Sequence, residues 1–466
     1  MTDRIFTRES TLPHSPEKVF SWHSRSGALE RLVPPWSRAR VVERRGGIEN
    51  GSRVTLELPL GPARFRWIAE HRDYLANRQF TDVQVEGPFS RWEHVHQMAP
   101  DGTDSCRLTD TIHYRLPAGM VGDALAGMQV RNELARTFAY RHRVTRLDLA
   151  AHAACDSLPS SVAVTGASGL VGASLVPFLR TGGHRVIEIG RSLRGPRPDR
   201  LRWDPDRKEL DVGALEGVDA VVHLAGENIA AGRWTSARKG AILASRIGTT
   251  RLLAERLATM RRPPRALISA SAIGYYGDTG DRIVTEHDSK GAGFLADVCA
   301  QWESATEPAR RAGIRVVNLR IGVVLTPKGG ALARMLLPFR LGAGGALGSG
   351  VQFMSWISID DLIRAIHHAI CDESLIGAVN AVAPQAVTNR EFARTLGKAL
   401  RRPALVPTPA VVLRAALGEM ADELLLASTR VTPARLIETQ FEFGDSDLET
   451  ALRWCIGRPS VDPRAS

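Results

Sequence analysis

Polar and apolar residues alternate over much of the first third of the chain. Such runs have the period of two that predicts half-buried β-strands, and turn residues such as Pro-Asp-Gly at 100–102 separate them. The strands predicted in this way cover residues 5–11, 52–60, 63–74, 78–87, 91–98 and 105–117. No glycine-rich phosphate loop interrupts this region, so the pattern favours an antiparallel sheet.

Two helices are predicted beside these strands. A short one begins at Ser15, with Pro16 at the first helical position, where its missing N–H costs nothing. A long one covers residues 119–147. Its expected apolar positions are Val121, Leu125, Met128, Leu134 and Phe138. An antiparallel sheet curved around this long helix is the simplest arrangement for residues 1–150.

The hydrophobic period changes at about residue 161. The stretch SVAVTGASGLVGASLVPFLRTGGHRVIEIGRS predicts a buried strand, a glycine turn, an amphipathic helix and a second strand, which together make a βαβ unit. Gly166 allows a tight turn, Gly169 lets backbone amides approach a pyrophosphate, and Gly172 lets the helix lie close to the strand. The helix N-terminus then offers unpaired amides to the anion. This placement predicts a dinucleotide site.

The end of the second strand distinguishes NAD from NADP. A carboxylate there would bind the ribose hydroxyls, whereas a cation would accept a 2′-phosphate. The strand ends in Gly190, Arg191 and Ser192, and Glu188 lies two residues too early. The sequence therefore favours NADP, the alternative being that Arg191 is only a surface cation.

Composition narrows the function classes. The chain has 466 residues, 44% of them hydrophobic and 24% charged, which indicates a globular protein of two or three domains without a membrane span. Its net charge is +11, but only six of its 61 basic residues are lysines and the excess is spread thinly, so we expect no nucleic-acid partner. The five scattered cysteines suggest packed, reduced thiols. The start of the chain, MTDRIFTRES, has no apolar signal core and predicts a cytoplasmic protein.

The first third also carries a family resemblance. The stretches SGALERLVPPW and GPFSRWEHVHQM, with the order of strands and helices, resemble the helix-grip domain of START proteins and polyketide cyclases, together called SRPBCC. The resemblance implies an α+β domain with a ligand cavity between sheet and helix. Trp36, Trp67, Phe89 and Trp92 would line such a cavity or form ordinary core.

The rest of the chain, from about residue 161, resembles the extended short-chain dehydrogenase/reductases. VDAVVHLAGENI looks like their fourth strand, RALISASAIGYYG their fifth and RVVNLRIGVVL their sixth. LAGENIAAGRW and LLPFRLGAGGALGSGVQFMSWISIDDL are similar to an atypical, epimerase/dehydratase-like subgroup that ends in a small domain of unknown function. The resemblance implies NADP contacts. The residues concerned are Gly166, Ser168, Gly169, Leu170, Gly172, Arg191, Ser192, Trp203, Leu224, Ala225, Gly226 and Glu227.

One expected part is missing. The family places a catalytic tyrosine and, four residues later, a lysine where this chain has Phe294 and Val298. Ser271 matches the family serine, and Tyr276 is the replacement acid that we name. Other candidates for the proton donor are Tyr275, Glu286, His287 and Lys290. Alternatively, water or the substrate supplies the proton and no protein acid is needed.

Two more groups have alternative interpretations. His94 and His96 alternate on a predicted strand and so share one face, as two metal ligands would, but the sequence offers no third ligand at a persuasive spacing, and we predict no metal site. Asp360 and Asp361 belong either to a substrate pocket or to the N-cap of the next helix, and we prefer the cap for Asp361.

The predicted architecture is a helix-grip domain at 1–150, a linker at 151–160, a doubly wound parallel Rossmann domain at 161–398 and a small helical C-terminal part at 399–466 that covers the substrate cleft. The predicted function is an NADP(H)-dependent oxidoreductase or epimerase-like enzyme acting on a small-molecule substrate. The alternatives are an NADPH-binding sensor without turnover and a carrier of lipid or another hydrophobic ligand in the N-terminal cavity.

Overall fold

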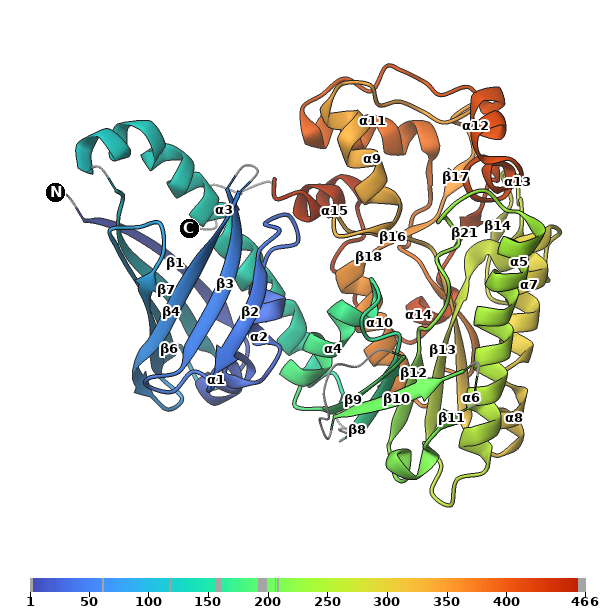
Figure 1. The fold of residues 1–466 in the computed structure, drawn as a ribbon, viewed down its shortest axis with the longest axis horizontal. Helices are drawn as coiled ribbons and strands as arrows, with labels where there is room; N and C mark the ends of the chain where they lie inside the picture. The colour runs from blue at the N-terminus through green and yellow to red at the C-terminus, as the bar shows by residue number, and fades with distance from the viewer. Residues whose placement is uncertain are drawn as a thin grey trace. The chain divides into compact units, whose positions relative to one another are not determined.

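The computed structural model describes residues 3–60, 63–117, 119–155, 161–191, 199–205, 207 and 209–459. The chain divides into two compact units (Figure 1). Unit 1 runs to Ala154 and includes Arg180–Gly183 and the chain from Arg453 onward. Unit 2 comprises Cys155–Leu179 and His184–Leu452. Within the described ranges, no helix is both long enough and apolar enough to cross a membrane.

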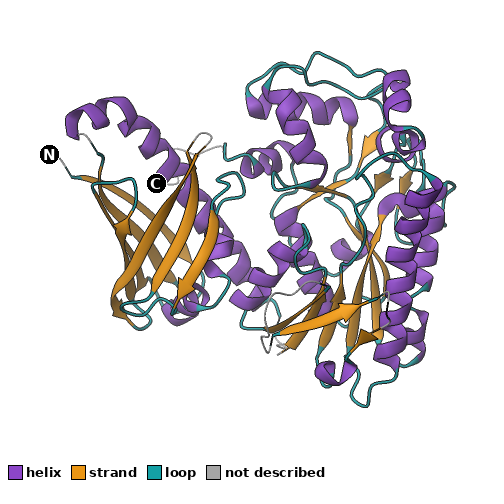
Figure 2. Cartoon of the chain, in the orientation of Figure 1, coloured by secondary structure: helices purple, strands orange, loops and turns teal. Residues whose placement is uncertain are grey.

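Unit 1 is built on one antiparallel sheet of seven strands in the order β1-β7-β6-β5-β4-β3-β2. The strands are β1 (Arg4–Leu12), β2 (Arg40–Arg45), β3 (Arg53–Leu60), β4 (Ala63–Leu75), β5 (Gln79–Glu86), β6 (Arg91–Pro100) and β7 (Cys106–Arg115). The helices are α1 (Pro16–Ser24), α2 (Ala28–Leu32) and the long α3 (Gly119–Ala153). Figure 2 shows this sheet together with the long helix, and the predicted helix-grip arrangement is confirmed.

The alternation of burial along β7, where every second residue is buried, explains why this sequence forms a one-sided sheet. The buried face packs around Trp22 of α1, and Leu134 and Phe138 of α3 close a second cluster. A buried ion pair between Arg31 and Asp148, with two contacts of 2.8 Å, ties α2 to α3.

Three sequence expectations for unit 1 need correction. The segment RVVERR forms strand β2, which the charge-rich sequence did not suggest, because an edge strand can carry charged side chains toward solvent. Met128 is 73% exposed rather than part of the apolar face of α3. Helix α3 continues to Ala153, three residues into the predicted linker 151–160. Residues 156–160 of that linker lie outside the described residues.

Unit 2 contains a sheet of eight strands in the order β11-β10-β9-β8-β12-β13-β15-β19. The strands are β8 (Ser161–Thr165), β9 (Arg185–Gly190), β10 (Arg200–Asp204), β11 (Glu209–Leu210), β12 (Ala220–His223), β13 (Ala266–Ala272), β15 (Arg315–Ile321) and β19 (Gly377–Ala381). All neighbours are parallel except β10 and β11. This order is the doubly wound order predicted from the sequence.

Helices cover both faces of the unit 2 sheet, with α6, α7 and α8 on one side and α4 and α10 on the other (Figure 1). Their bounds are α4 (Gly172–Thr181), α5 (Ser236–Leu243), α6 (Thr249–Ala258), α7 (Phe294–Ser304), α8 (Glu307–Arg311) and α10 (Ile359–Cys371). The strands between them are buried on both faces, as in β13, where the first six residues are buried.

The remaining elements of unit 2 lie between the strands of the large sheet along the chain, or after its last strand. The helices are η1 (Val212–Leu215), η2 (Ala244–Gly248), η3 (Ile273–Tyr276), α9 (Gly330–Arg340), α11 (Asn389–Leu400), α12 (Ala410–Leu417), α13 (Glu419–Ala421), η4 (Asp422–Leu426), α14 (Ala434–Glu438) and α15 (Leu448–Cys455). The short strand pairs are β14 (Ile283–Val284) with β21 (Arg430–Val431), β16 (Val323–Leu325) with β18 (Trp356–Ser358), and β17 (Phe353–Met354) with β20 (Val387–Thr388). Helix α11 crosses the predicted boundary between residues 398 and 399.

Two local expectations in unit 2 are wrong. Cys155 and Cys371 form a disulfide across 216 residues of sequence, whereas we expected reduced cysteines throughout. Only the fold brings two such distant positions together. Ser358, not Asp361, caps α10, because its Oγ accepts the Asp361 N–H at 3.1 Å. The Asp361 carboxylate is buried and accepts the N–H groups of Gly444 and Asp445, each at 2.9 Å.

Candidate functional site

The turn between β8 and α4 meets the loop that follows β12. Gly166 comes directly after β8 and has φ +68°, a conformation that favours glycine. A Cβ on Gly166 would lie 2.8 Å from the carbonyl carbon of Leu224, so no side chain fits there. The sheet continues through β9 on one side of β8 and through β12 on the other. This is the point at which strand order reverses, and doubly wound sheets bind their ligands at such a point.

The other two glycines of the turn differ in what surrounds them. A Cβ on Gly172 would lie 2.3 Å from the Gly166 carbonyl oxygen, so the first turn of α4 presses against the loop. A Cβ on Gly169 would meet only that same oxygen, at 3.1 Å, and the residue is exposed. The backbone at Gly169 therefore borders open space at a helix N-terminus. A phosphate group fits such a cradle.

Two further predicted contacts, Ser168 and Leu170, lie in the same turn. Ser168 is exposed, and Leu170 is half-buried. The Leu170 side chain lies beside Gly329, where a Cβ would come within 2.8 Å of Leu170 Cδ1. The Leu170 side chain therefore packs beside Gly329, whereas Ser168 is exposed at the surface of the turn.

The carboxyl end of β9 carries a cation. Arg191 follows β9 directly and is exposed. Glu188 lies inside β9, opposite Arg200 of β10, and its carboxylate is 3.8 Å from the Arg200 guanidinium. Glu188 is therefore engaged across the sheet. Ser192, the other predicted contact here, lies outside the described residues.

Two buried polar groups near the carboxyl ends of β10 and β12 lack partners. Trp203 is 2% exposed, and its ring lies 5.8 Å from that of His223. The His223 Nδ1 contacts the Thr165 hydroxyl at 2.7 Å, and burial lowers the pKa of His223 to about 4. Among the described residues, neither Trp203 Nε1 nor His223 Nε2 has a hydrogen-bond partner. Unpaired buried groups of this kind are uncommon.

The loop from Leu224 to Glu227 is held in place by its backbone. The Thr165 hydroxyl accepts the N–H groups of Leu224 and Ala225 at 3.2 and 3.3 Å. The Glu227 N–H donates to Ser245 Oγ at 3.1 Å, and its carboxylate pairs with Arg238 at 3.3 Å. Gly226, between these anchors, is exposed. The loop is therefore fixed beside the glycine turn.

Ser271 belongs to a polar row across three parallel strands. Ser271 of β13 is opposite Arg320 of β15, which is opposite Asn380 of β19. Glu303 of α7 joins the row: its carboxylate accepts Ser271 Oγ at 2.7 Å and two guanidinium N–H groups of Arg320 at 2.9 Å. Residues Glu303 and Arg320 were not identified from the sequence. For Arg320, the available signal was a charged residue inside the otherwise largely apolar run RVVNLRIGVVL.

Tyr276 completes this network. Its hydroxyl accepts an N–H of Arg320 at 2.8 Å and donates to the Asn380 side-chain oxygen at 2.7 Å. The side chain is 2% exposed, and burial raises the pKa of Tyr276 to about 12. The geometry places Ser271 and Tyr276 in one network. Both are already committed to partners within it.

The other candidate acids are dispersed. Tyr275 lies under the Arg320 guanidinium at 3.4 Å from its ring centre. The buried Glu286 carboxylate accepts the backbone N–H of Asn380 at 2.9 Å. His287 is exposed, and the exposed Lys290 pairs with Asp297.

Phe294 and Val298, which replace the family's tyrosine and lysine, lie on the first turns of α7. The backbone N–H of Phe294 and that of the next residue donate to the Glu423 carboxylate at 2.8 and 2.7 Å. Lys239 Nζ lies 4.7 Å from the Phe294 ring centre and Trp234 packs at 5.2 Å. Val298 is buried. An ammonium group is thus present near the vacated tyrosine position, and the sequence did not indicate it.

Unit 1 contains a cavity of about 560 Å³ between its sheet and α3. Of the four aromatic residues that the sequence assigned either to a cavity wall or to ordinary core, Trp67, Phe89 and Trp92 line it, whereas Trp36 packs against Tyr140. Apolar side chains make up most of the rest of the wall. They include Leu32, Val33, Leu56, Leu58, Val130, Leu134 and Phe138.

One part of that wall is polar. His94 and His96 share it with Asp82, which lies opposite His94 on the neighbouring strand. The sequence did not suggest this third group because the pairing of β5 with β6 brings it there. Burial lowers the pKa of His94 to about 4. For His96, burial is outweighed by the carboxylates of Asp110 and Asp82, which raise its pKa to about 9.

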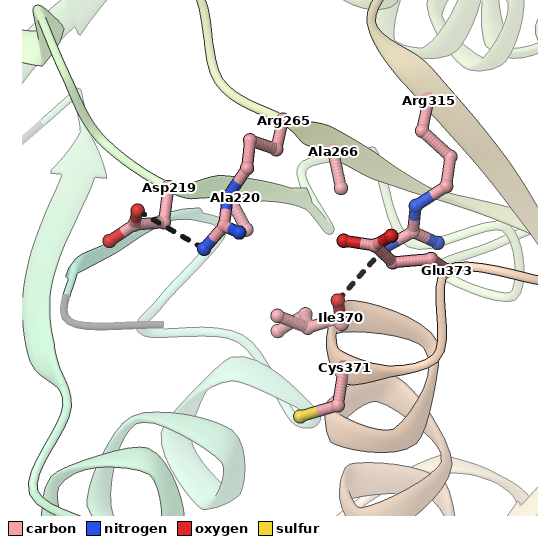
Figure 3. A pocket seen from close by; sticks show the side chains of 8 residues that line it. All are labelled: Asp219, Ala220, Arg265, Ala266, Arg315, Ile370, Cys371 and Glu373. Atoms are coloured by element: carbon pink, nitrogen blue, oxygen red, sulfur yellow. Dashed lines mark hydrogen bonds and ion pairs between the residues drawn. The ribbon is translucent and has the colours of Figure 1, made fainter. Parts of the chain in front are cut away.

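A smaller hollow of about 280 Å³ lies where β12, β13 and β15 begin (Figure 3). Arg265 pairs with Asp219 at 3.5 Å, and Arg315 donates to the Ile370 carbonyl oxygen at 2.8 Å. Both arginines of this hollow therefore have partners in the protein itself. It is also at the amino ends of the strands, the edge opposite the glycine turn, so we do not assign the functional site to it.

Three known families match successive parts of the chain. Residues 12–142 match the family described as polyketide cyclase / dehydrase and lipid transport. Residues 162–380 match the NAD dependent epimerase/dehydratase family, and residues 408–455 match a domain of unknown function, DUF1731.

Individual proteins extend these matches. The epimerase family protein Mb2239 of Mycobacterium bovis is 46% identical over 299 residues, which are 64% of this chain and 98% of that protein. The crystal structure of a nucleoside-diphosphate sugar epimerase from Corynebacterium glutamicum has a TM-score of 0.81 and 35% identity, and the alignment covers 99% of this chain and 92% of that one. The crystal structure of human epimerase family protein SDR39U1 with NADPH has a TM-score of 0.59 and 36% identity, covering 64% of this chain and 99% of that one. The chain therefore belongs to the epimerase family, as an atypical short-chain dehydrogenase/reductase with a polyketide cyclase-type domain ahead of the epimerase part.

Proposed function

We propose that unit 2 is an NADP(H)-dependent oxidoreductase or epimerase-like enzyme that acts on a small-molecule substrate. The observation that carries this proposal is the side-chain-free cradle at Gly166, Gly169 and Gly172, at the switch point of the sheet. The human relative crystallised with NADPH supports the choice of cofactor. When bound, the nicotinamide accepts a hydride from an alcohol carbon or returns one to a carbonyl carbon.

Different residues of the chain would bind different parts of the NADP(H) molecule. The backbone amides at the start of α4 would hold the pyrophosphate, and Arg191 would neutralise the 2′-phosphate. The loop Leu224–Glu227 would form the wall beside the ribose, and Trp203 Nε1, which has no hydrogen-bond partner among the described residues, would donate to the cofactor. Ser192 stays a predicted contact.

Ser271 and Tyr276 remain our proposed catalytic pair. Arg320 and Glu303 hold both side chains, which supports a fixed geometry. A phenol with a pKa of about 12 keeps its proton at neutral pH, so Tyr276 suits proton donation to a nascent alkoxide better than it suits proton abstraction. The proposed direction for this pair is therefore carbonyl reduction.

The substrate class also comes from a relative. The Corynebacterium glutamicum protein, which aligns along almost the whole of this chain, is called a nucleoside-diphosphate sugar epimerase. We therefore propose sugar nucleotides as the first substrates to test, with small ketones and aldehydes as the second set.

A second function belongs to unit 1. The cavity of about 560 Å³ with a largely apolar wall favours binding of a hydrophobic ligand, either as substrate or as cargo. The two functions are compatible because they occupy different units. The alternative of an NADPH sensor without turnover would require cofactor binding but no reaction with any carbonyl compound.

Substituting Gly169→Asp should abolish NADPH binding, because a carboxylate would occupy the space next to the helix N-terminus where the pyrophosphate binds. Titration calorimetry measures the affinity, and circular dichroism checks the fold. Gly213→Asp is the matched control, since a Cβ there also meets a single oxygen, at 3.1 Å, but far along the chain from the turn. Wild-type affinity in the Gly169→Asp protein would refute the site.

The preference for NADPH should depend on Arg191. Arg191→Ala removes a charge-assisted contact, and we expect NADPH affinity to fall about ten- to a hundredfold while NADH affinity stays unchanged. Arg185→Ala, at the opposite end of β9, is the control. Equal losses for both nucleotides would show that Arg191 does not bind the 2′-phosphate.

Tyr276→Phe should lower kcat for carbonyl reduction by about a hundredfold or more if the phenol donates the proton, with NADPH affinity unchanged. The measurement is initial-rate kinetics on the substrate panel, with thermal unfolding recorded in parallel. A lower melting temperature with unchanged kcat would instead make Tyr276 a structural link between Arg320 and Asn380.

Leu134→Trp should reduce the binding of 1-anilinonaphthalene-8-sulfonate, because the larger side chain fills part of the unit 1 cavity. The control is Leu405→Trp, at a site that is 81% exposed. Fluorescence titration of the folded proteins measures the effect. If both variants bind the dye like the wild type, the cavity does not take apolar ligands.

A further inference from the structure

The polar part of the unit 1 cavity wall resembles a metal site, in which some residues face the ion and others support them from behind. Asp82, His94 and His96 face the cavity, whereas Asp110 and His142 lie behind them and are not part of its lining. Strand register produces these layers, because Asp82 is opposite His94 between β5 and β6, and Asp110 is opposite His96 between β6 and β7.

The three front residues converge. Asp82 Oδ2 lies 3.3 Å from His96 Nε2 and 3.7 Å from His94 Nδ1. One ligand atom from each residue lies within 4.8 Å of the others. Two ligands bound to one cation at about 2.1 Å are roughly 3.0 to 3.4 Å apart in octahedral or tetrahedral geometry. The two separations from Asp82 Oδ2, 3.3 and 3.7 Å, are close to these values.

The groups behind them fix which ring nitrogens point into the cavity. Asp110 Oδ1 accepts a hydrogen bond from His94 Nε2 at 2.8 Å and lies 2.7 Å from His96 Nδ1. Its other oxygen contacts His142 Nε2 at 2.7 Å. A carboxylate that holds the far nitrogen of a histidine is the usual support of a metal-binding imidazole, because it sets both tautomer and ring orientation. Here Asp110 does so for His94, and its Oδ1 also lies within ion-pair distance of the far nitrogen of His96.

Neighbouring side chains restrain the same three groups. The His96 ring stacks on Phe80 at 4.1 Å, and the His94 ring meets Phe138 edge-on at 5.1 Å. His71 Nε2 lies 2.9 Å from Asp82 Oδ1, which leaves Oδ2 on the side of the other ligands. The cluster is therefore already organised for binding.

We propose that Asp82, His94 and His96 bind one divalent first-row transition cation at the wall of the unit 1 cavity. Two imidazoles and one carboxylate on one face leave the remaining coordination positions open, and these face the cavity. A ligand of the site would be an apolar molecule that carries an oxygen donor, since the rest of the wall is mostly apolar. The rival arrangement is a proton on His96 shared between its two carboxylate neighbours, with no metal.

The test uses the full chain, treated with EDTA and dialysed, and then titrated separately with Co²⁺ and Zn²⁺ in a calorimeter. We expect one ion per chain, with a higher melting temperature in the presence of the ion, because a cation that binds only the folded state stabilises it. Elemental analysis after gel filtration checks the stoichiometry. Failure to bind either ion stoichiometrically would overturn the proposal in favour of the hydrogen-bonded cluster.

Variants locate the ion. Asp82→Asn and His96→Gln keep side-chain size but remove a ligand, and each should weaken binding at least a hundredfold, whereas Asp110→Asn should weaken it about ten- to a hundredfold. His113→Gln, on β7 but outside the cluster, should bind like the wild type. Circular dichroism and unchanged NADPH affinity in unit 2 would show that the variants are folded. Binding that survives in Asp82→Asn and His96→Gln would place the ion elsewhere and refute this site.

Discussion

The close approach of backbone to backbone at Gly166 is the constraint on which unit 2 depends. The turn after β8, the loop after β12 and the start of α4 meet where any side chain would collide, at 2.3 to 2.9 Å from neighbouring main-chain atoms. Three consecutive consequences follow from that contact. The N-terminus of α4 offers its free amides at this contact, and the loop Leu224–Glu227 is held beside it. Among the described residues, apart from its chain neighbours, only the Gly166 carbonyl oxygen lies within 4 Å of a Cβ placed on Gly169.

Phe294 and Val298 stand where the resembled family has its tyrosine and lysine, and neighbouring side chains pack around Phe294. Phe294 is covered by Lys239 and Trp234, and its backbone is anchored by Glu423 from the C-terminal part. Ser271 and Tyr276 contact the buried ion pair of Arg320 and Glu303. Buried ion pairs contribute little net stability but strongly penalise alternative arrangements that would leave one charge unpaired. This explains how three strands and α7 hold their carboxyl ends in one fixed position.

Unit 1 uses an antiparallel sheet for a similar purpose. Cross-strand neighbours on one face lie close enough to interact, so single polar residues on β5, β6 and β7 combine into one cluster although they are separated along the chain. The apolar remainder of the cavity raises the cost of leaving these groups unpaired. Their mutual contacts therefore determine the shape of the polar wall, while the aromatic residues determine its volume.

Local pattern was sufficient for much of this fold. The period-two runs located six of the seven strands of unit 1, and the strand–glycine–helix order located the turn at Gly166, because backbone sterics and helix-end amides act within a few residues. The same reasoning missed β2, whose charged edge hides its alternation, and the Cys155–Cys371 bond, whose partners are 216 residues apart. It also missed Glu303, Arg320, Asp82 and Asp110. Their roles arise from register and packing between distant segments, which are properties of the tertiary structure. A single stretch of sequence shows at most that Arg320 is a charged residue in an apolar run, and not which groups it meets.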